Sequence, residues 1–208
     1  AASLERLLEA QRRLLLDVSH ELRTPVTRMK LQLELLPDQS RTESMREDLR
    51  DMEAMIADIL EAARLRHEAG ALCLVETDLV VLLREVVARH GDRPPGVTAR
   101  FPDAPVPAVA DVEKIATVAR NLLDNAWKYS QSSNRPVELT LTSPGDRAVI
   151  TVRDHGVGVS AQALPHLFQP FYRADASRAR ATGGFGLGLS LCQAIVQAHG
   201  GRIAIESV

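Results

Sequence analysis

Two stretches near the start of the chain repeat apolar residues at the spacing of an amphipathic helix. They lie within residues 4–36 and 49–63, where steps of three, four and seven place the repeated positions on one side of a helix. The positions are Leu15, Val18, Leu22, Met29, Leu33 and Leu36, followed by Leu49, Met52, Ile56, Ile59 and Ala63. Pro37, Asp38 and Ser40 indicate a turn between them. The sequence therefore predicts a helical hairpin.

An isolated hairpin of this kind cannot bury both apolar stripes. Pairing of two chains into a four-helix bundle covers both stripes at once, so we expect a homodimer formed through the hairpin. The pattern leaves one alternative open, a monomeric hairpin packed against the rest of the chain.

The composition and charge of the chain argue against several classes of protein. Of 208 residues, 45% are hydrophobic and 25% are charged, which is the balance of a globular protein with a packed core. The formal net charge of -2 provides no basic excess for a phosphate backbone, so we expect no nucleic-acid partner. The sequence predicts neither a membrane span nor a signal peptide within this chain. Cys73 and Cys192 lie far apart, which disfavours a disulfide framework or a zinc site.

After Gly70 the pattern changes to short helices and strands, which predicts an α+β unit. Residues 91–107 are expected to form a loop that encloses one short strand. The other expected elements are helices at Leu79 to His90, Asp111 to Ser130 and Leu189 to His199, and strands at Val137 to Thr142, Ala148 to Arg153 and Ile203 to Val208.

A histidine interrupts the first predicted helix. His20 lies two residues from both Val18 and Leu22, so it is off the apolar seam and is expected to reach solvent. Pro25 has no N–H for the carbonyl of Glu21, so the helix is expected to bend beside the histidine. A zinc protease would need a second histidine where Thr24 stands. The pattern leaves open a nucleophilic histidine or an ordinary exposed one.

Polar side chains gather on one face of the helix predicted within "NLLDNAWKYS". Asn121, Asn125 and Lys128 follow each other at steps of four and three. Amide oxygens suit Mg²⁺ that also binds phosphate oxygens, and an ammonium group suits phosphate. A plain solvated helix face is the alternative.

Two glycine-containing stretches follow. In "DHGVGV", Asp154 at a strand end is able to accept a hydrogen bond from an exocyclic amine, while Gly156 and Gly158 allow close approach of a ring. In "TGGFGLGLS", glycines lead into the start of a helix, where free N–H groups attract anions. Either stretch alone also fits an ordinary turn. The polar loop between them, "ADASRARAT", has the composition of a mobile lid.

Together these stretches resemble the conserved boxes of histidine protein kinases. "SHELRTP" resembles the H box, "NLLDNAWKYS" the N box, "DHGVG" the first glycine box, "LFQPFYR" the F box and "GGFGLGL" the second glycine box, in the family's order. The resemblance covers nearly all of the chain.

The resemblance implies two domains. Residues 1–70 would form a dimerisation and phosphoacceptor hairpin. Residues 71–208 would form a catalytic ATP-binding domain, an α/β sandwich of the gyrase, Hsp90, histidine kinase and MutL type. The family usually continues into one more strand, so the resemblance implies that this domain lacks its last strand here.

The resemblance also implies an activity and assigns residues to it. His20 would receive the γ-phosphoryl group of ATP, Glu21 would orient or deprotonate its ring, and Thr24 would help to remove phosphate from the partner. Asn125 would hold Mg²⁺, assisted by Asn121. Arg173 would be a catalytic residue near the γ-phosphate. Lys128 would approach the phosphates, Tyr129 would line the nucleotide pocket and Asp154 would bind the adenine amine. The other implied nucleotide-site residues are Gly156, Gly158, Gly184, Gly186, Leu187 and Gly188.

The implied partner is the receiver domain of a response regulator, whose aspartate would take the phosphoryl group. The implied location is the cytoplasmic portion of a bacterial inner-membrane sensor, with any membrane contact made by a region upstream of this chain. Two alternatives stay open. One is a non-catalytic dimerisation scaffold, and the other is a gyrase-like ATPase without phosphohistidine, which leaves "SHELRTP" unexplained.

Overall fold

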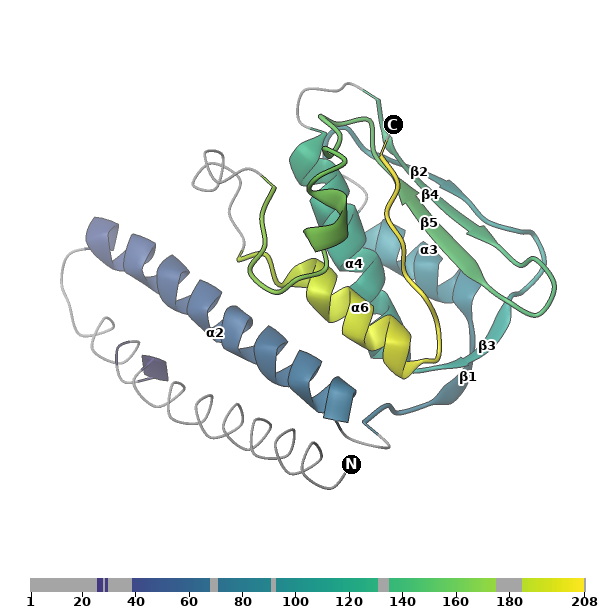
Figure 1. The fold of residues 1–208 in the computed structure, drawn as a ribbon, viewed down its shortest axis with the longest axis horizontal. Helices are drawn as coiled ribbons and strands as arrows, with labels where there is room; N and C mark the ends of the chain where they lie inside the picture. The colour runs from purple at the N-terminus through teal and green to yellow at the C-terminus, as the bar shows by residue number, and fades with distance from the viewer. Residues whose placement is uncertain are drawn as a thin grey trace. The chain divides into compact units, whose positions relative to one another are not determined.

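The computed structural model describes residues 26, 27, 29, 39–67, 71–90, 93–130, 135–174 and 185–207 (Figure 1). The chain divides into two compact units, Ala1–Ala69 and Gly70–Val208. The expected first helix of the hairpin and the turn after it lie largely outside the described residues.

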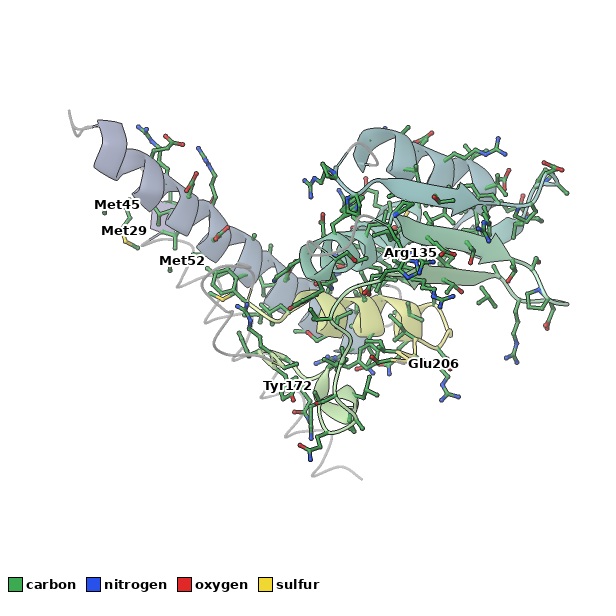
Figure 2. All side chains as sticks on the ribbon, turned by 90° about the horizontal axis from the view of Figure 1, so that it is seen from above. Met29, Met45, Met52, Arg135, Tyr172 and Glu206 are labelled. Carbon is green, nitrogen blue, oxygen red and sulfur yellow. The ribbon has the colours of Figure 1, made fainter. Side chains whose placement is uncertain are left out.

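The described part of the first unit is dominated by one long helix, α2 (Gln39–His67). Leu49, Ile56 and Ala63, at the predicted seam positions, are buried. Val26, on the preceding helical segment, is 1% exposed and clusters with Leu49 and Ile56, while Met52 packs against that cluster (Figure 2). The predicted apolar stripe of this helix is therefore confirmed.

The second unit contains two small sheets (Figure 1). The larger sheet has the order β2–β4–β5, in which β2 and β4 are parallel and β4 and β5 are antiparallel. The smaller sheet pairs β1 and β3 in antiparallel orientation. The strands are β1 (Val75–Asp78), β2 (Val97–Arg100), β3 (Pro107–Ala110), β4 (Val137–Thr142) and β5 (Val149–Arg153).

Helices cover one face of the larger sheet, which makes the α/β sandwich that was expected. They are α3 (Leu79–His90) and α4 (Val112–Tyr129), and a short 3-10 helix η1 (Leu164–His166) and helix α6 (Gly188–Ala198) come later in the chain. Alternation along β4 buries Val137, Leu139 and Leu141 against Leu83 of α3 and Leu123 of α4. Helix α4 also packs along α6 (Figure 1).

The expected strand from Ile203 to Val208 is wrong for the residues that the structure describes. Residues 201–207 have no strand assignment. Ile203 and Ile205 are half-buried, as the alternating pattern suggested, but a strand also needs a backbone ladder. In this segment Ser207 Oγ accepts the Val159 N–H over 2.8 Å. This bond involves a side chain and is not part of a backbone ladder.

Asp111 ties three parts of the second unit together. It caps α4 by accepting the Lys114 N–H over 3.1 Å, and its other oxygen accepts the Cys73 N–H over 2.9 Å. Its own N–H donates to His199 Nε2, at the end of α6, over 3.0 Å. Burial opposes ionisation, but the amide bonds from Cys73 and Lys114 and the charge of Lys114 hold the pKa of Asp111 below its ordinary value.

We expect Asp111→Ala to lower the free energy of unfolding by about 2 kcal/mol at neutral pH, because a helix cap and a long-range hydrogen bond are lost. Because the pKa of Asp111 is lowered in the folded chain, the ionised carboxylate adds its full stability at any pH above the ordinary pKa of the group. This stability is lost as the pH falls through the lowered pKa. Urea denaturation at neutral and acid pH measures both effects. Asp103→Ala, at an exposed loop position, is the control. Equal stability of wild type and Asp111→Ala at neutral pH would contradict the assignment.

Candidate nucleotide-binding site

The polar face of α4 meets the start of α6. Asn121 Nδ2 donates to the Thr117 carbonyl over 3.1 Å, which orients the amide. A Cβ placed on Gly188 would lie 2.7 Å from Asn121 Oδ1, so only glycine fits there without movement. Leu187 precedes α6 without a side-chain cap, which leaves first-turn N–H groups of the helix available to an anion.

Asn125 lies one turn further along the same face. Its side chain is half-buried, and no hydrogen bond from it is found within the described part of the chain. The described residues also contain no cluster of three or more His, Cys, Asp or Glu side chains that could hold a metal by themselves. Any ion held here would therefore need ligands from the nucleotide and from water, which is the usual coordination of Mg²⁺.

The next turn of α4 carries Lys128, on which the charge of Arg173 from the F-box segment acts. Burial of the ammonium group lowers the pKa of Lys128, and the charge of Arg173 lowers it further. Lys128 Nζ lies 5.4 Å from the ring centroid of the half-exposed Tyr129. Two cationic side chains at a partly buried position are suited to an anion such as phosphate.

The turn after β5 packs against the C-terminal end of α4. Asp154 Oδ1 accepts the Gly156 N–H over 2.9 Å and so closes the turn. A Cβ on Gly156 would lie 2.3 Å from the Tyr129 carbonyl oxygen. Gly158 follows with a φ of 68°, in the region that favours glycine. Asp154 itself is exposed.

The F-box segment packs against the second glycine stretch. The Phe171 N–H donates to the Gly186 carbonyl over 3.1 Å. Gly186 has a φ of 75°, and a Cβ there would lie 2.8 Å from the carbonyl oxygen of Tyr172, the residue that Figure 2 labels in this segment. Phe171 has a φ of 65° although it is not glycine, and backbone strain of this kind often occurs at functional sites.

Three separate loops thus converge on α4. The Tyr129 carbonyl lies against the first glycine stretch, the charge of Arg173 in the F-box segment acts on Lys128, and Asn121 lies against the second glycine stretch at Gly188. Of the residues predicted for the site, His20, Glu21, Thr24 and Gly184 lie outside the described residues.

Two polar features near this site were not expected. Trp127 Nε1 and Ser130 Oγ are buried without a hydrogen-bond partner in the described structure. His155 Nε2 lies 3.1 Å from Glu138 Oε1. Strand alternation predicts part of the His155–Glu138 contact. Glu138 falls between Val137 and Leu139, which face the core, so Glu138 must face away from it.

Both units match known protein families. Residues 10–68 match the family described as "His Kinase A (phospho-acceptor) domain", and residues 110–208 match "Histidine kinase-, DNA gyrase B-, and HSP90-like ATPase". The chain belongs to the histidine kinases. The predicted family and fold class are therefore confirmed, and the ATPase domain implies use of a nucleotide.

Curated relatives of this histidine kinase chain are similar over nearly its whole length. Sensor protein RstB of Escherichia coli is 35% identical over 211 residues, which cover 100% of this chain and 48% of RstB. Sensor histidine kinase CpxA of Escherichia coli is 33% identical, covering 98% of this chain and 46% of CpxA. The chain thus spans about half the length of these relatives.

Solved structures support the same fold. Full-length ShkA in complex with AMPPNP matches with a TM-score of 0.68 and 28% identity, covering 90% of this chain and 41% of ShkA. The histidine kinase AdeS of Acinetobacter baumannii matches in fold, with a TM-score of 0.59 and 21% identity over 86% of each chain. No helix in the described part of the kinase is long and apolar enough to span a membrane.

Proposed function

We propose that this chain phosphorylates His20 with ATP and transfers the phosphoryl group to an aspartate on the receiver domain of a response regulator. The observation that supports this most strongly is that the first glycine stretch packs on the end of α4, the second meets Asn121 on its polar face, and the charge of the F-box arginine acts on Lys128. The match of residues 10–68 to a phosphoacceptor family supports the presence of an acceptor in the same chain.

We assign the adenine end of the nucleotide to the turn after β5. Asp154 is exposed and accepts hydrogen bonds, so its carboxylate is suited to the adenine amine. Gly156 and Gly158 let the backbone approach the ring, and the half-exposed Tyr129 lines the pocket beside them. The contact of Gly156 with the Tyr129 carbonyl supports placing these residues at one subsite.

We assign the phosphates to the other end of the α4 face. Lys128 and Arg173 would neutralise phosphate charge, while Gly184, Gly186, Leu187 and Gly188 would bring backbone N–H groups to it. Asn125, assisted by Asn121, would hold Mg²⁺ together with phosphate oxygens and water. Bound Mg²⁺ would supply further charge neutralisation, which is the main requirement of phosphoryl transfer.

On the acceptor side, one nitrogen of the neutral His20 imidazole would attack the γ-phosphorus, and the bond from that phosphorus to the bridging oxygen would break to release ADP. Glu21 would hold or remove the proton on the other nitrogen, so that the attacking nitrogen keeps its lone pair. Thr24 would help to place water for removal of phosphate from the phosphorylated regulator. The protein would then act as both kinase and phosphatase.

The domain organisation completes the proposal. Residues 1–70 would form the dimerisation and phosphoacceptor hairpin, and residues 71–208 the catalytic domain. The homodimer would form through the hairpin as a four-helix bundle. The names of the relatives support a role in a sensor protein, and we place the chain in the cytoplasmic portion of a membrane-bound sensor.

Incubation with γ-labelled ATP and Mg²⁺ tests the proposal. We expect label on the protein that is stable to alkali and labile to acid, because phosphohistidine has this stability pattern and phosphoserine does not. Removal of divalent ions by EDTA should reduce the label to background. Nucleotide binding without any label would instead favour the non-catalytic scaffold.

A further inference from the structure

The outer face of the larger sheet carries a partly buried contact between a carboxylate and a histidine. Glu138 of β4 points away from the core because its neighbours Val137 and Leu139 point into it. His155 Nε2 lies 3.1 Å from Glu138 Oε1, and the two side chains are only 12% and 23% exposed. Since a carboxylate only accepts, His155 Nε2–H is the donor.

Positive charges around Glu138 keep it ionised. The hydrogen bond from His155 lowers the pKa of Glu138 most, and the charges of Arg100 and Arg153 lower it further. Arg153 stands directly opposite Glu138 in the β4–β5 register, and Arg100 comes from β2. The contact therefore joins an ionised carboxylate to the histidine, and charge-assisted bonds of this type are stronger than neutral ones.

This contact lies where the β4–β5 ladder ends. The register pairs Glu138 with Arg153 and continues no further, so the turn that begins at Asp154 has no strand pairing. The bond from Gly156 to Asp154 is internal to the turn. Among the described contacts of this turn, the His155–Glu138 bond is the one that fastens it to the sheet.

The side chains of Asp154 and His155 have different roles in this turn. Asp154 closes the turn by accepting the Gly156 N–H, and Gly156 abuts the end of α4. His155, between them in sequence, is anchored to β4 instead. A shift of His155 would therefore displace Asp154 on one side and Gly156 on the other.

We infer that His155 and Glu138 are positioning residues that hold the Asp154 turn in place for adenine, and so determine how well the chain selects ATP over purine nucleotides without the 6-amine. This inference rests on the proposed assignment of Asp154 to the adenine amine. The pair acts through the turn and touches no nucleotide.

Calorimetric titration with ATP and with purine riboside triphosphate, which lacks the 6-amine, tests the inference. We expect His155→Ala and Glu138→Ala each to weaken ATP binding about tenfold, the size of one charge-assisted hydrogen bond. Binding of purine riboside triphosphate should change by less than about twofold, because its base offers no amine to Asp154. Glu138→Gln, which keeps an acceptor oxygen for His155, should restore most of the selectivity.

Controls and outcomes separate this role from a merely structural one. Glu76→Ala, at an exposed position on β1, should leave both affinities unchanged. Equal weakening of both nucleotides in His155→Ala and Glu138→Ala, or no weakening of either, would overturn the inference while leaving the proposed kinase intact. Failure of the wild-type chain to prefer ATP over purine riboside triphosphate would instead overturn the assignment of Asp154 and the inference with it.

Discussion

Replacement of His20 by glutamine is expected to abolish acid-labile labelling from γ-labelled ATP. Glutamine keeps a polar side chain of similar length but has no nitrogen lone pair that can attack phosphorus, because the amide lone pair is delocalised. Nucleotide binding should stay within about twofold of wild type, since the proposed binding residues all lie in residues 121–188. The measurement is label per chain after alkali and acid treatment, beside calorimetric ATP affinity.

His90→Gln, at the last residue of α3, is the matched control and should retain full labelling. Label that persists in His20→Gln at the wild-type level would disprove His20 as the acceptor. ATP hydrolysis that continues unchanged without His20, and without any phosphohistidine in the wild type, would favour a gyrase-like ATPase instead.

Gly156→Ala is expected to weaken nucleotide binding strongly. The new Cβ would lie 2.3 Å from the Tyr129 carbonyl oxygen and 2.9 Å from Asp154 Oδ1. The first of these atoms is backbone at the end of α4, so the turn itself must move away. That movement would displace Asp154 from the adenine subsite, and we expect ATP affinity to fall at least about a hundredfold. Overpacking should also cost about 1–3 kcal/mol of stability.

Gly145→Ala separates the loss of binding from a general loss of stability. Gly145 lies in the turn between β4 and β5 with a φ of 68°, and a Cβ there would meet nothing within 4 Å. This variant should lose about 1 kcal/mol of stability through backbone strain yet bind ATP normally. If Gly156→Ala binds ATP as tightly as wild type, the turn after β5 is not part of the nucleotide site.

Local pattern was sufficient to predict much of the fold and part of the site. The bounds of α3 and β4 agree with the expected ranges, because a run of apolar residues at one period is bounded by turn residues in each case. The expected limits of the α4 helix, Asp111 and Ser130, are its caps. The shared face of Asn121, Asn125 and Lys128 also follows from helical spacing alone.

Pairing between distant residues could not be predicted in the same way. Strands β1 and β3 are four residues each and lack a clear alternation, and their register of Val75 with Ala110 joins segments far apart in sequence. Ile203 to Ser207 has the alternation of a strand but no ladder in the described structure. Alternation reports which side of a segment is buried, whereas strand formation requires a partner edge.

By itself, the sequence determined the period of each element, the order of the five boxes and the residue types available for phosphate, adenine and a magnesium ion. These properties are local, since they depend on spacing along one helix or turn. Only the tertiary structure decided that the charge of Arg173 acts on Lys128, that Gly156 abuts the carbonyl of Tyr129 and that Glu138 anchors His155. Each of these interactions joins residues on different elements. The distances between those elements depend on how the core packs helix α4 against the sheet.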